Sequence, residues 1–421
     1  MTIEETVLSG DLRVVSDRMD SVESVSIGIW VNAGARNEDA SNNGVSHLLE
    51  HMAFKGTDRR SSLDIATEIE NVGGHLNAYT SRETTVYYAT VLKENINLAL
   101  DVISDIVLHS NFDNDELDRE RGVVLQEISQ ANDTPDDIVF DLFQETAYPD
   151  QPLGRPILGT EDSVGSMSRE TLVDYINRQY GSDKMVVAAA GNLDPEDFER
   201  RAEDAFKGMS ISTAPPPAAG NYRGGDVRDT RDLEQAHLVM GFEGVGFNDR
   251  DYYPLAVLST ALGGGMSSRL FQEIREKRGL AYSVYSFSSA FNDGGLFGLY
   301  AGTGEEQLNE LVTAVSGELL RIAEQQITED ELTRSRAQIK AGVLMSLEST
   351  SSRAERMARH LMVYGRIMPV NEMSQNIDAV SADDVRRVAG RLLQSPPTIA
   401  AMGPVGGLAD YTSLQAVLGV R

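Results

Sequence analysis

The alternation of apolar and polar positions predicts a chain built from both strands and helices. Apolar runs at residues 25–31 and 237–242 are typical of strands, and residues 81–91, rich in Thr, Val and Tyr, predict another. Residues 94–109 carry apolar side chains at helical spacing. Because neighbouring strands and grouped helices are mixed in this way, we expect an α+β fold in which a mainly antiparallel sheet carries helices on one face.

The order of these elements repeats along the chain. Each half has an apolar strand, a helix with an apolar stripe, a strand, a long helix and a helix opening with Asp-Glu-Leu-x-Arg, at 115–119 and at 330–334. The segment 211–228, with three consecutive prolines, predicts an extended linker. We therefore expect two homologous domains, residues 1–210 and 229–421.

The charge balance excludes some partners. The 421 residues include 37 Lys and Arg against 65 Asp and Glu, a formal net charge of −28, which repels nucleic acid and anionic membranes. The start resembles neither a secretory signal nor a transit peptide, and no apolar stretch is long enough to span a membrane. A cytoplasmic location is the expectation. The absence of cysteine leaves only His and carboxylates as zinc ligands.

Residues 44–57, GVSHLLEHMAFKGT, contain the most specific chemical pattern. His47 and His51 are four residues apart, so a helix places both on one face, where they can bind one metal ion. Glu50 projects beside them and can accept a proton from an attacking water. This is the H-x-x-E-H pattern of the inverzincins. With six histidines in the chain, chance produces it about one time in a hundred.

A catalytic zinc site needs a third protein ligand. The pattern at 114–133 predicts a helix on which Glu120 and Glu127, seven residues apart, share a face. Val123, Val124 and Ile128 predict that the neighbouring surface lies in a core. The spacing alone leaves open that either Glu is an ordinary solvated residue.

Together these features resemble the M16 peptidases, the pitrilysin and processing-peptidase family. In that family H-x-x-E-H is followed 76 residues later by a Glu, and here 51 + 76 gives Glu127. The resemblance implies that His47, His51 and Glu127 bind one Zn²⁺ per chain and that Glu50 is the general base. The family also has a Glu at the position of Glu120, which we expect to support a ligand from behind.

Two segments, DQPLGRPILG at 150–159 and LGGGMSSRLF at 262–271, are similar to the catalytic β subunit of the mitochondrial processing peptidase and its bacterial relatives. The resemblance implies a bacterial zinc endopeptidase that cuts unfolded peptides or leader-like segments.

The second half lacks the zinc motif, and its repeat places Gly342 where the first half has Glu127. Arg275 and Tyr282, seven apart, match a family pair that holds the substrate carbonyl and the developing oxyanion. Without the resemblance, such a pair is more often a surface Arg beside a core Tyr. Single-chain members of the family have four repeats and this chain has two. The resemblance therefore implies a homodimer enclosing a chamber, in which this pair acts on the partner's zinc.

Candidate substrate-binding residues also follow from the resemblance. Asn77 and Ala78 lie in a segment similar to the family's edge strand beside the zinc, where an extended substrate can pair by main-chain hydrogen bonds. Phe54 matches an apolar wall for the residue after the cut. Asp137 and Asp141 match an acidic pair that receives a basic residue near the cut. An ordinary edge strand, a core Phe and solvated carboxylates remain alternatives.

The alternative function is a non-catalytic or partner-dependent subunit of a processing-peptidase-like complex. Such subunits typically carry broken zinc motifs, whereas this motif is intact. The short Gly263-Gly264-Gly265 run contrasts with the long glycine-rich loop of the non-catalytic processing subunit. The other four histidines have no ligand spacing and are expected to be structural or surface residues: His75, His109, His237 and His360.

Overall fold

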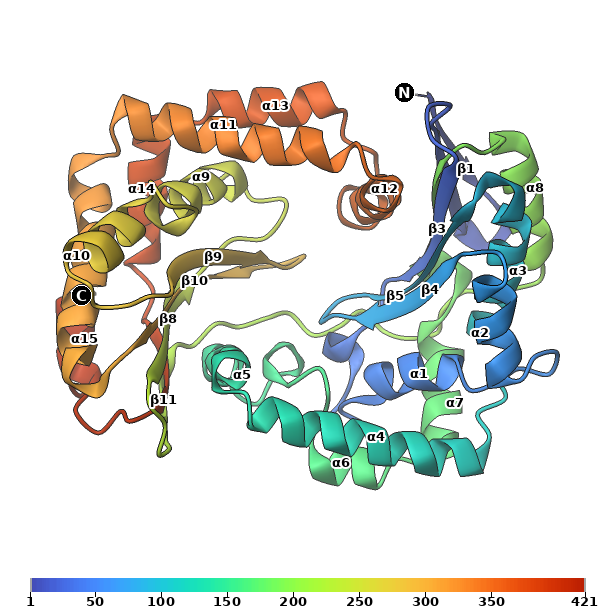
Figure 1. Ribbon diagram of the computed structural model, residues 1–421, viewed down its shortest axis with the longest axis horizontal. Coiled ribbons are helices and arrows are strands. Elements are labelled where there is room, and N and C mark those ends of the chain that lie inside the picture. The colour runs from blue at the N-terminus through green and yellow to red at the C-terminus, as the bar shows by residue number, and fades with distance from the viewer. Residues whose placement is uncertain (1, 420–421) are drawn as a thin grey trace. The chain divides into compact units, whose positions relative to one another are not determined.

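The computed structural model describes residues 2–419, which form two compact units (Figure 1). The first contains the chain up to Gln130 together with Arg155–Ala218 and Met345–Ile367; the second contains the rest. Each unit therefore includes a helix from the other half of the sequence. Helix α5 (Pro135–Ala147) belongs to the second unit and α12 (Thr350–Tyr364) to the first. The boundaries predicted from the sequence describe the two repeats and stay a prediction.

The first unit is built on a six-stranded sheet in the order β1-β2-β6-β3-β5-β4. All neighbouring strands are antiparallel except β2 and β6, so the sheet is mixed but mainly antiparallel, close to the prediction. The strands are β1 (Thr2–Val7), β2 (Arg13–Arg18), β3 (Ser24–Val31), β4 (His75–Thr80), β5 (Thr85–Leu92) and β6 (Met185–Gly191).

The strand predicted at 25–31 is confirmed as β3, but the one predicted at 81–91 begins only at Thr85. Its first residues instead close the turn between β4 and β5. The Ser81 N–H donates to the Thr84 carbonyl over 2.7 Å, and the Ser81 hydroxyl accepts from the Thr84 N–H over 3.0 Å. Serine and threonine favour such turns because their hydroxyls bond to nearby backbone.

One face of this sheet packs on helices encoded by the first half. Val25, Ile27 and Ile29 of β3 point into that core. The helices of this unit from the first half are α1 (Val45–Ala53), α2 (Ser62–Glu70), α3 (Ile96–Leu108), α4 (Asn114–Asn132), α6 (Glu161–Gly165), α7 (Arg169–Gln179) and α8 (Pro195–Ala205). The helices predicted at 94–109 and 114–133 are confirmed as α3 and α4.

The opposite face of the sheet is covered by α12 (Figure 1). Trp30 and Val186 of the sheet pack there against Met357 and Leu361 of the helix. The expectation that helices cover only one face was wrong for this sheet. Its central strands carry apolar side chains on both faces, and the second face is covered by a helix that arrives from the other half of the chain.

The second unit repeats this plan with five strands in the order β7-β11-β8-β10-β9. Only the β7–β11 pair is parallel. The order matches β2-β6-β3-β5-β4 of the first sheet, which confirms the duplication inferred from the sequence. The strands are β7 (Gly225–Thr230), β8 (Ala236–Glu243), β9 (Val284–Ala290), β10 (Gly295–Thr303) and β11 (Thr398–Gly403).

Helices cover both faces of the second sheet as well. One face packs on helices of the second half, and the other packs on α5 through Val139, Phe143 and Ala147. The remaining helices of this unit are α9 (Tyr252–Gly263), the π-helix η6 (Phe271–Lys277), α10 (Leu308–Gln325), α11 (Glu329–Ser346), α13 (Val370–Ala379), α14 (Ala382–Leu392) and α15 (Tyr411–Val417). Short 3₁₀ turns are η1 (Ser9–Asp11), η2 (Ala35–Asn37), η3 (Lys93–Asn95), η4 (Pro152–Gly154), η5 (Ser182–Lys184) and η7 (Glu305–Gln307).

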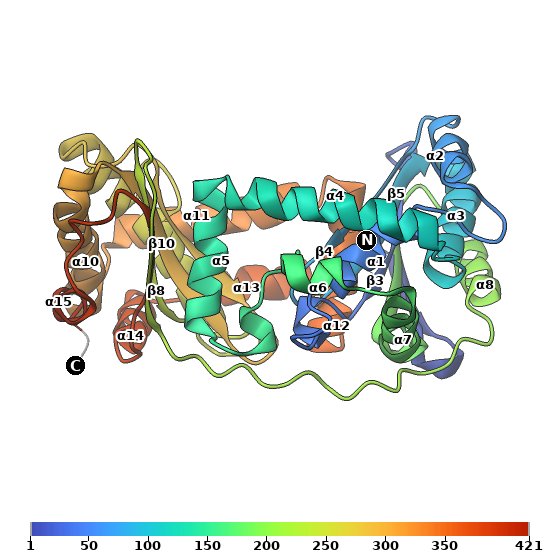
Figure 2. The same cartoon turned by 90° about the horizontal axis from the view of Figure 1, so that it is seen from below.

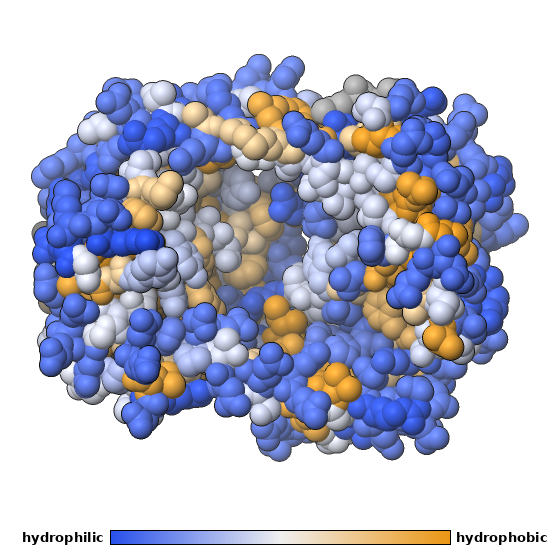
Figure 3. Space-filling model, in the orientation of Figure 1, coloured by the Kyte–Doolittle hydropathy of each residue, from blue (hydrophilic) through white to orange (hydrophobic). Residues whose placement is uncertain are grey.

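The segment between the halves is extended (Figure 2). Residues 211–224 form neither helix nor strand, whereas the last four residues of the predicted linker, 225–228, already lie in β7. Most of the surface visible in Figure 3 is hydrophilic, in keeping with the high charge. Among residues 2–419, no helix combines the length and the apolar character that crossing a membrane requires.

The packing of α5 on the second sheet predicts a large cost for removing Phe143, which is 1% exposed. A Cβ on Gly241 would lie 2.6 Å from the Phe143 ring, so ring and strand are in close contact. We expect Phe143→Ala to lower the free energy of unfolding by about 3–5 kcal/mol. Glu145→Ala, at an exposed position of the same helix, should change it by less than about 0.5 kcal/mol in the same urea titration. Equal effects would contradict this packing role.

Candidate metal centre

Helix α1, which carries the H-x-x-E-H motif, has a firmly fixed start. Gly44 precedes it with φ 91°, and a Cβ there would lie 2.7 Å from the Leu158 carbonyl oxygen, so only glycine fits. The buried Glu38 carboxylate accepts hydrogen bonds from the backbone N–H groups of Gly44, over 2.7 Å, and Ser46, over 2.9 Å. These contacts satisfy backbone donors at the helix start that have no partner within the helix.

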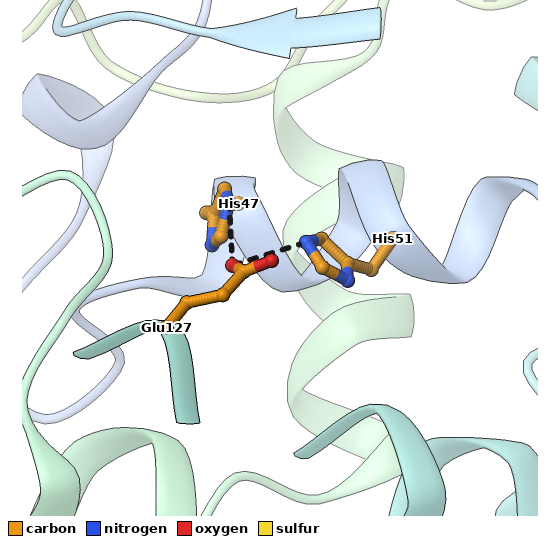
Figure 4. A group of neighbouring side chains, drawn as sticks. All are labelled: His47, His51 and Glu127. Carbon is orange, nitrogen blue, oxygen red and sulfur yellow. Dashed lines mark ion pairs between the residues drawn. The ribbon is translucent and has the colours of Figure 1, made fainter. Parts of the chain in front are cut away.

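His47 and His51 lie one turn apart on α1, and Glu127 projects toward both from α4 (Figure 4). The Glu127 Oε2 atom is 3.6 Å from His47 Nε2 and 3.5 Å from His51 Nε2. One ligand atom from each residue lies within 4.8 Å of the others. Among the described residues, this is the one group of three or more His and carboxylate side chains close enough to bind a metal ion.

The spacing of these atoms fits a zinc ion. Two ligands, each about 2.05 Å from a tetrahedral zinc, lie about 3.4 Å apart, close to the His–Glu127 separations. The separations are longer than usual charge-assisted hydrogen bonds. Burial, reinforced by the neighbouring His51, lowers the pKa of His47 to about 4. The imidazole is thus neutral near pH 7, which is the form that binds metals.

Glu120 supports His51 from behind. Its Oε2 lies 2.9 Å from His51 Nδ1, and its Oε1 accepts from Lys55 Nζ over 2.6 Å. This contact orients the ring so that Nε2 faces Glu127. By contrast, His47 Nδ1 is buried without a partner among the described residues. Glu120 therefore has the position behind His51 that was expected, and Val124 and Ile128 are buried on the same helix. Val123 was also expected in the core, but it is 39% exposed.

Glu50 lies on the same helix and is held by Thr80 of β4, whose hydroxyl donates to Glu50 Oε2 over 2.7 Å. Burial raises the pKa of Glu50, and the Thr80 hydrogen bond partly opposes this effect. A carboxylate with a raised pKa accepts a proton near neutral pH more readily than an exposed one. Sequence reasoning missed Thr80, because nothing in the pattern of β4 pairs it with a residue thirty positions earlier.

The predicted edge strand is confirmed, because β4 is the last strand of its sheet. Asn77 is exposed, Ala78 is buried, and the Asn77 side-chain oxygen accepts from the Ala78 N–H over 2.8 Å. Phe54 is half-buried and lines a cavity of about 370 Å³ together with Ile69 and Leu76. The cavity lies between α2 and β4.

Comparison with known proteins places this arrangement in a family. Residues 13–161 match the family described as insulinase (peptidase family M16), and residues 166–339 match the peptidase M16 inactive domain. A zinc protease of Streptomyces coelicolor is 41% identical, over 96% of this chain and 90% of that relative. The chain belongs to peptidase family M16. The zinc protease YmxG of Bacillus subtilis is 38% identical, over 96% of this chain and 99% of that relative.

Solved structures support the fold of this M16 chain. A protease from Helicobacter pylori aligns with a TM-score of 0.90 at 23% identity, over 96% of this chain and 99% of that one. A chain of complex III2 from Candida albicans, solved with Inz-5 bound, aligns with a TM-score of 0.86 at 21% identity, over 99% of both chains. Because its relatives are zinc proteases and its His-His-Glu group fits the ion, the cofactor of this M16 protein is Zn²⁺.

The other candidate residues of the M16 chain belong to the second unit. Arg275 of η6 donates to the Tyr282 carbonyl over 3.1 Å, and its guanidinium lies 4.1 Å from the centre of the Tyr282 ring. Tyr282 is 75% exposed, so it is not the core residue of the alternative interpretation. Asp137 and Asp141 lie one turn apart on α5; Asp137 is exposed and Asp141 half-buried.

The remaining histidines form no metal group with one another among the described residues. His237 Nδ1 lies 2.9 Å from the Tyr300 hydroxyl, and the buried His360 packs edge-on against Tyr364. These contacts agree with the structural roles expected for them.

The contact between Glu120 and His51 predicts a measurable loss of metal affinity on mutation. Glu120→Gln should weaken zinc binding by about 10–100-fold, because the amide no longer fixes the His51 ring as strongly. Competition with a chromophoric chelator measures this change. Asp118→Asn, an exposed position on the same helix, should leave the affinity unchanged. Equal affinities for the wild-type protein and Glu120→Gln would remove the supporting role.

Proposed function

We propose that this chain is a zinc endopeptidase that hydrolyses unfolded peptides or leader-like segments. The observation that carries the proposal is the position of Glu50. It lies on the helix of the two histidine ligands, and Thr80 holds it there. A structural zinc site is closed by four protein ligands, whereas this group offers three and leaves a position for water.

Each residue then has a definite task. The ligands His47, His51 and Glu127 would hold the Zn²⁺. When bound, this ion acts as a Lewis acid toward the attacking water and the peptide carbonyl. Glu50 accepts a proton from that water and passes it to the nitrogen of the leaving amine. Thr80 keeps the Glu50 carboxylate pointed at the reacting atoms during both transfers.

The edge strand and its neighbouring cavity support an extended peptide as substrate. Peptides recognised in this way add a strand to an open sheet edge, which here is β4 with Asn77 and Ala78. Phe54 and the 370 Å³ cavity suit an apolar side chain after the cut. We further propose that Asp137 and Asp141 receive a basic residue near the cut, because their carboxylates form one acidic face on α5.

Two chains are proposed to form the working enzyme. The resemblance to four-repeat members implies a homodimer in which Arg275 and Tyr282 stabilise the oxyanion on the partner's site. Their mutual contact and the exposure of Tyr282 support this role, since an exposed phenol is free to meet a substrate.

The second candidate is a non-catalytic or partner-dependent subunit. The chain of Candida albicans complex III2 shares the fold, so the fold alone does not identify a peptidase. The complete His47–His51–Glu127 group and the adjacent Glu50 favour catalysis. Nothing on such a subunit would require a half-buried carboxylate with a raised pKa beside a metal group.

The role of Glu50 predicts that Glu50→Gln retains zinc but loses hydrolysis. We expect kcat for an unstructured arginine-containing peptide to fall by a factor on the order of 10²–10⁴, because no base accepts the proton. Metal analysis of both proteins provides the control. Undiminished cleavage by the zinc-loaded variant, or no cleavage of a varied peptide set by the zinc-loaded wild type, would reject the proposed mechanism.

The proposed dimer predicts complementation between two inactive variants. Chains carrying Glu50→Gln and chains carrying Tyr282→Phe should each be weak alone. If Tyr282 acts on the partner's zinc, each mixed dimer contains one site with both residues intact and should have about half the wild-type activity. Random reassembly of a 1:1 mixture makes about half of the dimers mixed, so the mixture should recover about a quarter. No recovery in verified mixed dimers would show that both residues act within one chain.

A further inference from the structure

A second cavity lies in the first unit on the face of the sheet that α12 covers, opposite α1. Its volume is about 230 Å³. Trp30, Tyr79 and Tyr88 form its wall on the sheet, and Glu355 lines it from α12. None of these residues takes part in the zinc centre described above.

Glu355 is the feature that gives this cavity a chemical preference. Its Oε2 accepts from Trp30 Nε1 over 3.0 Å and from the Tyr79 hydroxyl over 2.7 Å. Its Oε1 accepts no hydrogen bond from the described residues, and within that part of the chain Glu355 forms no ion pair. Burial, followed by the nearby Glu355 carboxylate, raises the pKa of Tyr79, so the phenol keeps the proton that it donates.

A carboxylate fixed at the edge of aromatic rings is a binding site for a cation. The ring faces attract positive charge, and the fixed carboxylate provides an acceptor that needs no reorganisation. The positive charge that acts on Tyr79 is that of Arg359, which lies one turn along α12 from Glu355 and is exposed. No cation of the described residues forms an ion pair with Glu355, so its carboxylate is available to a cationic ligand.

The position of Tyr79 connects this cavity with the edge strand. On β4, Thr80 points to the face where Glu50 lies, and Tyr79 points to the opposite face. Side chains of a peptide paired with β4 alternate between the same two faces. A long side chain on the Tyr79 face starts about 4.8 Å from β4, one strand spacing away, and extends along the sheet surface toward Tyr79 and Glu355.

We propose that the Trp30–Tyr79–Tyr88–Glu355 cavity is a subsite for the guanidinium or ammonium group of a basic substrate side chain. That residue lies an odd number of positions from the residues that face the zinc centre. The proposal rests on the proposed peptidase function and concerns a different cavity from the one at Phe54: the two share Tyr88, but α12 lines this one and α2 lines the other. It adds a second source of basic preference, separate from Asp137 and Asp141.

The experiment uses pairs of otherwise neutral peptides that carry arginine or its uncharged analogue citrulline at one scanned position. In the wild type we expect kcat/KM to favour arginine by about tenfold at one register. Glu355→Gln should bring this ratio close to 1. Glu348→Gln, the same charge change at an exposed site, should keep the ratio. An arginine preference that survives unchanged in Glu355→Gln at every register would overturn the subsite.

A second readout separates this proposal from the peptidase mechanism. Trp30 is the only tryptophan in the chain, so its fluorescence reports on this cavity alone. In the zinc-loaded Glu50→Gln protein, the arginine peptide should shift or quench the emission and the citrulline peptide should not. A fluorescence response without wild-type cleavage would retain the subsite and reject the peptidase. Cleavage with neither a fluorescence response nor a Glu355 effect would do the reverse.

Discussion

The chemistry of this protein depends on one constraint: two imidazoles one turn apart on a buried helix need a carboxylate from elsewhere in the chain. Helix α4 meets that need twice. Glu127 completes the group of metal ligands, and Glu120, two turns earlier, fixes the ring of His51. The start of α1 is held independently by Gly44 and by the Glu38 carboxylate. The site is therefore as rigid as the packing between two helices, which is what a preorganised metal centre requires.

Much of this could be predicted from the sequence, since it depends on local spacing. The interval between His47 and His51 fixes their common face, and the interval between Glu120 and Glu127 fixes theirs. Only the family resemblance predicted that these two helix faces meet around one metal ion. Thr80 could not be foreseen, because its contact with Glu50 depends on the side to which β4 turns that residue. The Glu355 contacts join positions more than 270 residues apart, beyond any local pattern.

The fold was predicted well in its repeats and less well in its layers. The strand order of the second sheet matches that of the first, as the repeated pattern indicated. The covering of both faces was missed. Hydrophobic periodicity shows that a strand such as β3 is buried on both sides, but it does not name the helix that covers each side. Here α12 and α5 come from the opposite halves of the chain.

This exchange of helices limits how the two halves can be separated. The first half alone would present the apolar ring of Trp30 and its neighbours to water, and the second half alone would do the same with the surface beneath Phe143. Each half thus carries part of the other's hydrophobic core, so the chain should fold as one cooperative whole despite its duplicated plan. Splitting the gene at the linker would therefore produce two aggregation-prone fragments and not two smaller stable proteins.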